Sequence, residues 1–375
     1  MMRVLLVTND FPPTVGGIQS YLRDFIATLP AEDVVVFAST QDAELAQLWD
    51  SAAPYRVYRA KTRVMLPTPR IARQMQEIIA TENIDVVWFG AAAPLAVLAP
   101  AARRAGASRV VASTHGHEVG WSMIPGARQV LGFIGRHCDV VTYISEYTLR
   151  RFRRAFGDVE FAWLPSGVDT SRFRLMDAAQ REVVRQRLGW DSDTRYVVCI
   201  SRLVPRKGQD VLIRSWPKVV ERFPNAELVF VGGGSFETRL RKLAAGVSRV
   251  SFWGRVDESV MEDAVHGADV FAMPCRTRGG GLDVEGLGIV FLEAQSAGIP
   301  VIAGDSGGAP ETVTPQSGFV VNGRDCDEVA DRVCALLADE SLRHSMGQAG
   351  REHVESTWAW PLMASRLRAV LGFRR

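Results

Sequence analysis

The stretch from residue 284 to residue 304, "VEGLGIVFLEAQSAGIPVIAG", holds a helix and a strand in succession. The apolar run after Gly288 predicts a helix, and "PVIAG" at 300–304 predicts a buried strand. A helix that leads directly into a buried strand is typical of a parallel sheet covered by helices. The stretch therefore predicts an α/β fold.

Two glutamates flank the apolar run. Glu285 precedes the expected helix, whereas Glu293 falls in its second turn. Burying a carboxylate is unfavourable by several kcal/mol unless a partner compensates for the lost water. The two acids therefore face either solvent or a cleft, which they would share with the free N–H groups of the helix's first turn.

The same alternation of β-rich and amphipathic segments runs through both halves of the chain. In the first half the predicted strands are 3–9, 34–40, 86–90, 109–114, 140–145 and 160–168. In the second half they are 196–203, 227–233, 250–256, 268–275, 300–304 and 317–321. This pattern predicts two doubly wound domains.

The domain boundary is predicted near residues 165–173, where turn residues end the first series and a charged helix at 180–190 opens the second. The domains are then 1–169 and 170–359, and a length of 375 residues also favours two cores over one. The last segment is helical in pattern but interrupted by Pro361. We expect its helix, 360–375, to return to the first domain.

The overall composition is that of a globular protein, with 47% hydrophobic and 23% charged residues. A net charge of +2 gives no general attraction to nucleic acid. The five cysteines show no C-x-x-C spacing, which favours free thiols in a reducing compartment. No signal peptide and no apolar run of about 18 residues is apparent. We therefore expect a cytoplasmic protein with at most peripheral membrane contact.

A pair of glycines follows the first predicted strand, and an amphipathic helix follows the pair. Gly16 and Gly17 allow backbone N–H groups to approach an anion, which the helix dipole also favours. The alternative is a simple strand-to-helix turn. The stretch does not match G-x-G-x-x-G, so the fingerprint of a dinucleotide-dependent oxidoreductase is missing here.

Two further loops at the ends of predicted strands carry polar side chains. "STHGHEVG" places His115 and His117 where open α/β sheets bind ligands, with Glu118 beside them. This spacing does not match a zinc motif, and a structural loop is the alternative. "SRLVPRKGQD" brings Arg202 and Lys207 together, which suits a pyrophosphate unless they form a surface charge run.

Two other stretches could contact a nucleotide sugar. The backbone at Arg255 and Val256, after the predicted strand at 250–256, can meet a flat base. Asp191 and Asp193 form an Asp-x-Asp pattern that could hold a metal, but they precede a strand instead of following one. We interpret this pair as a solvated turn.

The combination of these motifs resembles a known family. The glycine pair, the His115 loop, "SRLVPRKG" and the E-x7-E pattern from Glu285 to Glu293 are similar, in this order, to the retaining glycosyltransferases of family 4. The resemblance spans nearly the whole chain and implies the GT-B fold of two facing Rossmann-like domains. The segment at 274–294 is most similar to the GDP-mannose-dependent phosphatidylinositol monomannoside mannosyltransferases of actinobacteria.

This resemblance implies roles for individual residues. Glu293 would bind the donor ribose, Glu285 the transferred sugar, and Arg202 and Lys207 the diphosphate. His115 would lie near the sugar and the β-phosphate. The backbone N–H groups expected at the diphosphate are those of Gly16, Gly17, Gly288, Ile289, Val290 and Phe291. The family needs no divalent metal and no further cofactor.

A lipid-linked acceptor would require contact with an anionic membrane at the inner face of the plasma membrane. The candidate basic residues are Arg56, Arg59, Lys61, Arg63, Arg70 and Arg73, with Val64, Met65 and Leu66 among them. A second group is Arg150, Arg151, Arg153 and Arg154. Each cation near such a surface contributes on the order of 1 kcal/mol. The alternative is that both groups are solvated helix faces and loops.

The predicted reaction is transfer of a second, α-1,6-linked mannose from GDP-mannose to phosphatidylinositol monomannoside. Three other classes stay open at this point. They are an NAD-dependent oxidoreductase, a GT-B enzyme with another nucleotide sugar or acceptor, such as an epimerase acting on UDP-N-acetylglucosamine, and a non-catalytic module that binds a nucleotide sugar or a lipid.

Overall fold

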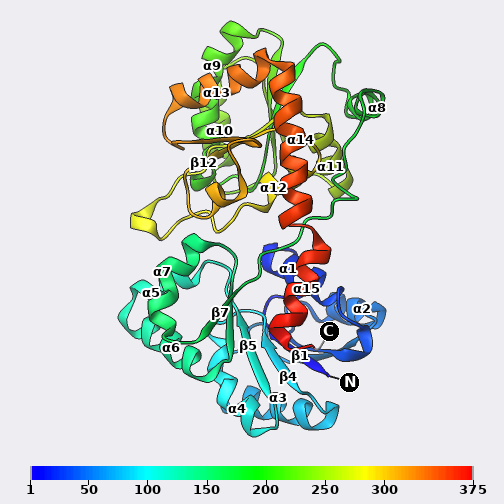
Figure 1. Cartoon of the computed structure of the whole chain (residues 1–375), viewed down its shortest axis with the longest axis vertical. Helices are drawn as coiled ribbons and strands as arrows, with labels where there is room; N and C mark the ends of the chain where they lie inside the picture. The colour runs from blue at the N-terminus through cyan, green and yellow to red at the C-terminus, as the bar shows by residue number, and fades with distance from the viewer. Residues whose placement is uncertain (1, 374–375) are drawn as a thin grey trace. The chain divides into compact units, whose positions relative to one another are not determined.

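The computed structural model describes residues 2–373, and these form two compact units. The N-terminal unit comprises residues up to Ser166 together with the segment from Pro361 onward, and the C-terminal unit runs from Gly167 to Trp360. Each unit is a parallel sheet covered by helices (Figure 1). The predicted fold of two doubly wound α/β domains is confirmed.

The sheet of the N-terminal unit has seven strands among the described residues, in the order β3-β2-β1-β4-β5-β6-β7. All its pairings are parallel. The strands are β1 (Val4–Thr8), β2 (Val34–Ser39), β3 (Arg56–Ala60), β4 (Val86–Phe89), β5 (Arg109–Ser113), β6 (Val140–Tyr143) and β7 (Glu160–Trp163). Six of these were predicted from the sequence, whereas the edge strand β3 was not.

Helices cover both faces of this sheet, as doubly wound sheets require. They are α1 (Gly17–Ile26), α2 (Ala43–Ala52), α3 (Pro69–Glu82), α4 (Ala99–Arg104), α5 (Glu118–Met123), α6 (Pro125–His137) and α7 (Glu146–Phe156). The apolar stripe predicted for α1 buries Tyr21, Leu22, Phe25 and Ile26.

The last helix of the chain, α15 (Trp360–Leu371), belongs to the N-terminal unit for nearly its whole length. Arg109 donates to the carbonyl of Val370 at 2.8 Å, and Arg368 donates to that of Thr28 at 2.9 Å. The predicted return of the C-terminal helix is therefore confirmed. Pro361 lies in the first turn of α15, where a missing N–H group is tolerated, so the helical break falls just before it.

The sheet of the C-terminal unit has six strands among the described residues, in the order β10-β9-β8-β11-β12-β13. All pairings are again parallel. The strands are β8 (Arg195–Ile200), β9 (Ala226–Val231), β10 (Val250–Gly254), β11 (Val270–Met273), β12 (Val301–Gly304) and β13 (Gly318–Val321). All six coincide with strands predicted from the sequence.

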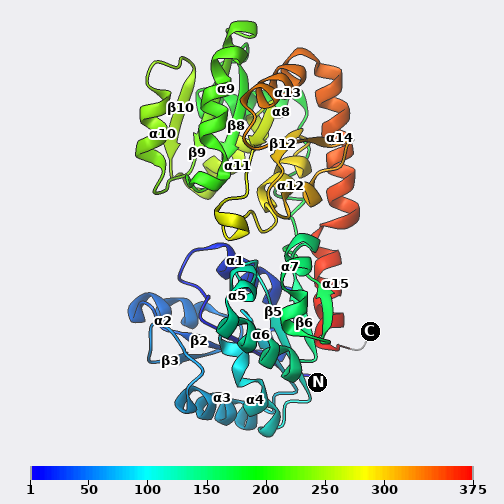
Figure 2. The same cartoon turned by 90° about the vertical axis from the view of Figure 1, so that its left-hand side faces the viewer.

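The helices of the C-terminal unit complete its layers (Figure 2). They are α8 (Ala178–Leu188), α9 (Gln209–Arg222), α10 (Glu237–Ala244), α11 (Glu258–Gly267), α12 (Ile289–Ser296), α13 (Cys326–Ala338) and α14 (Glu340–Thr357). Helix α12 is the predicted helix of the opening stretch, and it packs against α14.

The strand order of each sheet reverses at one point. In the N-terminal sheet this switch lies between β1 and β4, and in the C-terminal sheet it lies between β8 and β11. Open α/β sheets bind ligands outside the carboxyl ends of the strands at such switch points, because the connections leave a crevice there. The loops that follow these four strands are therefore where each unit should carry its site.

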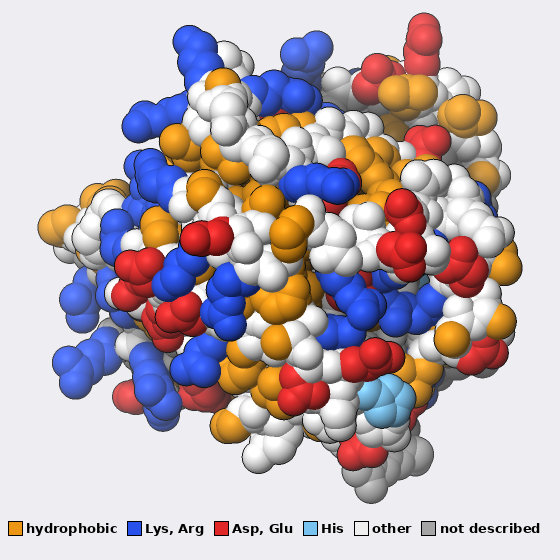
Figure 3. Space-filling model, turned by 90° about the horizontal axis from the view of Figure 1, so that it is seen from above, with side chains coloured by type: hydrophobic (Ala, Val, Ile, Leu, Met, Phe, Trp, Pro, Cys, Tyr) orange, Lys and Arg blue, Asp and Glu red, His pale blue; other side chains and the backbone are white. Residues whose placement is uncertain are grey.

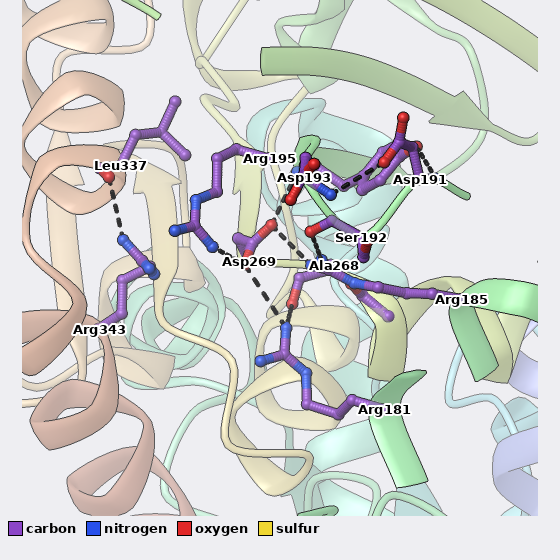
Figure 4. A network of polar contacts seen from close by, with 12 residues as sticks. Arg181, Arg185, Asp191, Ser192, Asp193, Arg195, Ala268, Asp269, Leu337 and Arg343 are labelled. Carbon is purple, nitrogen blue, oxygen red and sulfur yellow. Dashed lines mark hydrogen bonds and ion pairs between the residues drawn. The ribbon is translucent and has the colours of Figure 1, made fainter. Parts of the chain in front are cut away.

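The opposite edge of the C-terminal sheet is held together by a buried aspartate. Asp269 accepts from the N–H of Tyr196 and from Arg185, both at 2.8 Å. Arg181 and Arg195 lie 3.6 and 3.8 Å from its other oxygen, and Figure 4 shows the arginines around it. The network joins α8 to the amino ends of β8 and β11, so it stabilises the edge away from the switch-point loops.

On the face seen in Figure 3, basic and acidic side chains are interspersed among apolar ones. That face therefore shows no field of a single sign. Among residues 2–373, no helix combines the length and apolar character needed to cross a membrane.

Candidate functional site

The C-terminal unit brings Lys207 and Glu285 together at the carboxyl edge of its sheet. The two side chains are 10% and 9% exposed, and Lys207 Nζ lies 2.7 Å from Glu285 Oε2. Burial alone would raise the pKa of Glu285, but Lys207, and more weakly Arg206 and Arg202, hold it below its ordinary value. Glu285 is therefore a buried, ionised carboxylate whose partner is a lysine.

Two arginines extend this cluster. Arg206 lies 3.7 Å from Glu285 and 3.4 Å from Asp283, and its Nε makes no hydrogen bond among the described residues. Arg202 is exposed, and its charge helps to lower the pKa of Glu285. The loop after β8 thus gathers three cations against one buried carboxylate, which leaves positive charge for a diphosphate.

The loop after β8, which carries Arg202 and Lys207 and is called the cation loop below, is held close to the sheet by Gly208, the N-cap of α9. Its φ is 79°, and a Cβ at this position would collide with the carbonyl oxygen of Pro274. Gln209 reinforces the loop by donating to Ser201 Oγ at 2.9 Å and to the carbonyl of Arg202 at 3.1 Å. The position of Lys207 therefore depends on backbone contacts that only glycine allows.

Helix α12 begins as predicted, with Gly288 as its N-cap. Gly288 has φ 91°, and no side chain caps the N–H groups of the first turn, which includes Ile289 and Val290. Phe291 is fully buried and packs edge-on against Phe271 at 5.7 Å, which anchors the turn to the sheet. The free N–H groups of this turn are available to an anion.

Glu293, in the second turn of α12, is in a different electrostatic state from Glu285. It is partly buried, and its side chain makes no hydrogen bond or ion pair among residues 2–373. Burial raises its pKa to about 7; Arg172 opposes this shift, whereas Glu258 and Glu262 add to it. The two glutamates of E-x7-E therefore have pKa values shifted in opposite directions, since one has a lysine partner and the other has none.

The loop after β12 holds the backbone of Glu285 in place, and this loop was not predicted as part of the site. Ser306 Oγ accepts from the N–H of Glu285 at 3.2 Å, and the carbonyl of Glu285 accepts from Gly308 N at 3.0 Å. Gly307 has φ 61°, and a Cβ there would collide with the same carbonyl. The sequence signal was present in "DSGG" after the predicted strand at 300–304. Arg206, within "SRLVPRKG", was also missed.

Two predicted base contacts lie on the loop that follows β10. Arg255 is exposed and Val256 is partly buried. The aliphatic part of Arg255 lies against Gly233, which follows β9. This places both residues at the carboxyl edge of the same sheet as the cation loop.

In the N-terminal unit, the glycine pair opens α1 as predicted. Gly16 is the N-cap and Gly17 the first helical residue, and no side chain caps the exposed N–H groups. A Cβ at Gly17 would meet no atom within 4 Å, so that side of the turn is open. The turn follows β1, which borders the switch point of this sheet.

His115 follows β5, and its ring is fixed. Nε2 lies 2.6 Å from the carbonyl of Gly90, so Nε2 carries the hydrogen, and the ring packs edge-on against Tyr21 at 4.9 Å. Burial lowers the pKa of His115, although Glu118 opposes this shift. In the neutral ring Nδ1 is then an acceptor, which suits a sugar hydroxyl, whereas a phosphate oxygen would require a donor.

The other two members of this loop form a pair. His117 Nε2 lies 3.1 Å from Glu118 Oε1, and the Glu118 side chain is fully buried. Its second oxygen accepts from the backbone N–H groups of His115 and Gly116 at 3.1 and 3.2 Å. Among the described residues, no group of three His, Cys, Asp or Glu is placed to hold a metal ion.

The predicted membrane residues divide into two sets. Arg59 is 14% exposed and bonds to Asp50 and to the carbonyls of Ser39 and Pro12, and Arg56 pairs with the buried Glu82. Met65 is fully buried, which corrects its place among the apolar contacts. The remaining residues are exposed; they are Lys61, Arg63, Val64, Leu66, Arg70 and Arg73. We call these six the basic patch.

The Asp191–Asp193 segment is a turn between α8 and β8, in agreement with its interpretation from the sequence. Asp191 Oδ1 accepts from the N–H of Asp193 at 2.9 Å, and Asn225 donates to the carbonyl of Asp193 at 2.6 Å. The turn lies at the amino edge of the sheet, away from the loops described above.

Comparisons with known proteins match both halves of the chain. Residues 15–172 match the family described as Glycosyltransferase Family 4, and residues 180–353 match Glycosyl transferases group 1. A GDP-mannose-dependent monoacylated α-(1-6)-phosphatidylinositol monomannoside mannosyltransferase of Corynebacterium glutamicum is 57% identical, over 98% of this chain and 97% of the relative. The GDP-mannose-dependent α-(1-6)-phosphatidylinositol monomannoside mannosyltransferase of Mycobacterium tuberculosis is 55% identical over the same shares.

Among solved structures, Anabaena HepE in complex with UDP superposes with a TM-score of 0.83 at 20% identity, covering 99% of this chain and 100% of that one. This likeness concerns the fold, and it agrees with the two doubly wound units. Together with the full-length relatives, it shows that the chain is a glycosyltransferase of family 4 with the GT-B fold.

Proposed function

We propose that the chain transfers mannose from GDP-mannose to phosphatidylinositol monomannoside, forming an α-1,6 linkage with retention of configuration at the sugar. The observation that carries this proposal is full-length identity of 57% and 55% to relatives that bear these donor and acceptor names. The cations and acids at the carboxyl edge of the C-terminal sheet supply the chemistry that such a donor requires.

The donor is assigned to the C-terminal unit. Lys207, Arg202 and Arg206 would hold the diphosphate, because three cations converge there on a single carboxylate. The free N–H groups at the start of α12 would add to this binding. Glu285 would contact the mannose and Glu293 the ribose. The backbone at Arg255 and Val256 would meet the guanine.

The proposed mechanism uses charge development on the leaving group. As the glycosyl phosphate bond breaks, negative charge grows on the diphosphate, and cations fixed by the fold then bind more strongly than in the ground state. The buried Lys207 meets this condition, since its position is set by Gly208 and by its pair with Glu285. The leaving phosphate would accept the proton of the acceptor hydroxyl on the same face of the sugar, without a divalent metal.

The acceptor is assigned to the N-terminal unit. A surface cavity of about 1030 Å³ lies at the carboxyl ends of β2 and β3, and its lining includes Thr40, Asp42, Gln47, Lys61 and Arg63. Hydroxyl, amide and charged side chains of this kind suit a headgroup rich in hydroxyls. Because two of the lining residues belong to the basic patch, a lipid headgroup in this cavity would lie beside cations that can contact its membrane.

We therefore also propose peripheral binding at the inner face of the plasma membrane, through the basic patch. Replacing Arg70 and Arg73 by glutamine should weaken binding to vesicles that contain anionic lipid by about 30-fold, since each cation contributes on the order of 1 kcal/mol. Both lie near the start of α3, where cations do not favour the helix, so the fold should be unaffected. Sedimentation with phosphatidylserine vesicles measures the change.

A matched control is available on α10, where Arg239 and Lys242 have the same spacing and are also exposed. Their replacement by glutamine should leave vesicle binding within about twofold, as expected for cations outside the contact surface. Equal loss in the two double variants, or no loss in either, would contradict the assignment of the membrane surface to the basic patch.

The proposed function is tested by transfer of labelled mannose from GDP-mannose to phosphatidylinositol monomannoside, with EDTA present and with UDP-glucose and UDP-N-acetylglucosamine as competing donors. We expect mannosylated lipid from GDP-mannose alone, with an α-1,6 linkage in the product. Consumption of a UDP-sugar without labelled lipid would replace this proposal with another donor or with an epimerase. A requirement for added divalent metal would overturn the metal-independent mechanism.

A further inference from the structure

The loop from His115 to Glu118 contains a buried carboxylate that the donor and acceptor assignments leave without a role. The Glu118 side chain is fully buried, at the first position of the short helix α5. Its Oε2 accepts from two backbone N–H groups of the loop, and its Oε1 lies 3.1 Å from His117 Nε2. The carboxylate therefore binds the three residues that precede it.

A buried carboxylate is stable only when hydrogen-bond donors replace the water it has lost. Glu118 has two such donors, the backbone N–H groups of His115 and Gly116, and both bind Oε2. Its Oε1 makes no hydrogen bond among the described residues and lies 3.1 Å from His117 Nε2. The His117 ring is 41% exposed, so this neighbour is a side chain that also reaches the surface.

These contacts determine where the His115 ring lies. Its backbone N–H is held by Glu118 at 3.1 Å, while its Nε2 donates to the carbonyl of Gly90. Tyr21 packs edge-on against the ring, and its hydroxyl donates a 2.7 Å hydrogen bond to the carbonyl of Leu164. Nδ1 is the ring nitrogen that makes no hydrogen bond among the described residues. Its direction depends on the position of the loop and hence on Glu118.

We propose that Glu118 is a positioning residue for mannosyl transfer. Its carboxylate holds the His115–His117 loop so that His115 Nδ1 is presented as an acceptor to a sugar hydroxyl. The inference rests on the proposed function, because it assigns Glu118 to the same reaction. Glu118 itself touches no substrate and acts through His115.

The test is Glu118→Gln, which keeps the size of the side chain but removes its charge and replaces one carboxylate oxygen with an NH₂ group. We expect kcat to fall about tenfold, in line with a small displacement of a reacting group, while KM for GDP-mannose changes less than about threefold. The ¹⁵N resonances of the His115 ring should also shift, since its environment changes. Steady-state kinetics, thermal unfolding and histidine NMR are measured on the same samples.

A second variant keeps the inference testable if Glu118→Gln does not fold. His117→Gln removes only the exposed partner, so the fold should be kept while the loop loosens, and we expect kcat to fall about threefold. Glu340→Gln is the control, because Glu340 also opens a helix, α14, but is exposed. It should match the parent in all readouts.

Two results would overturn the inference. One is an unchanged kcat in Glu118→Gln with a lowered melting temperature, which indicates a purely structural role. The other is an unchanged His115 resonance in both variants. If the parent protein transfers no mannose at all, the proposed function fails, whereas the NMR comparison still decides whether Glu118 positions His115.

Discussion

Replacing Lys207 by alanine should lower kcat for mannosyl transfer by about 10²-fold or more, the range found when one preorganised donor to a developing anion is removed. The effect should appear in kcat more than in donor KM, because the interaction strengthens as charge moves onto the diphosphate. The structure adds a second consequence. Glu285 loses its 2.7 Å partner and stays buried, so the variant should also be less stable, by about 3 to 5 kcal/mol.

A second substitution separates the two effects. In Lys207→Ala/Glu285→Gln the buried charge is gone, so much of the stability should return while kcat stays low. Lys218→Ala is the matched control, because Lys218 also pairs with carboxylates, those of Asp327 and Asp331, but is 42% exposed. Its stability and its activity should both stay close to those of the parent. Near-normal kcat in folded Lys207→Ala would refute the diphosphate assignment.

The fold was predictable from the sequence to a large extent, because buried parallel strands read as apolar runs. Twelve of the described strands were predicted from such runs, including β7 and β10, which are only partly buried. The exception, β3, has the sequence "RVYRA" and lies at the sheet edge, where only Ala60 is buried. Arg56 and Arg59 on this strand pair with Glu82 and Asp50, so residues that appear to form a basic surface stretch are partly structural.

The candidate site was predictable where residues follow the carboxyl end of a strand, as do Gly16, His115 and Lys207. The sequence could not show which partner each charge takes. Glu285 was expected to gain its hydrogen bonds from a sugar, yet it already forms an ion pair with Lys207, which is far from it in sequence. Such pairings depend on how separate loops converge, and no local pattern in the chain encodes that convergence.

The difference between Glu285 and Glu293 has a thermodynamic consequence. A carboxylate with a lysine partner is ionised before the donor arrives, so its electrostatic contribution is preorganised. A carboxylate without a partner must be ionised in order to accept hydrogen bonds from both ribose hydroxyls. With a pKa of about 7, Glu293 must lose its proton when the donor binds at or below neutral pH, and this deprotonation weakens binding. Donor affinity should therefore depend on pH through Glu293.

Below pH 7, KM for GDP-mannose should rise about tenfold for each pH unit, because the ionised fraction of Glu293 falls by that factor, and above pH 7 it should level off. Glu293→Gln should abolish this dependence and raise KM by about 10- to 100-fold, since hydrogen bonds to a charged group are lost. Initial rates at pH 5.5 to 8.5, at saturating acceptor, measure both effects.

Stability should change in the opposite direction. The folded pKa of Glu293 lies above its ordinary value of 4.5, so the folded state binds more protons than the unfolded state between these values, and stability falls as pH rises through this window. Glu293→Gln removes the cost of ionising a buried carboxylate and should be more stable than the parent at pH 8, by up to about 3 kcal/mol, with no difference near pH 4.

Glu352→Gln, at an exposed glutamate on α14, is the control and should match the parent at both pH values. A parent KM that is flat from pH 6 to 8, or a Gln variant that is less stable at pH 8, would show that Glu293 is already ionised in the free enzyme.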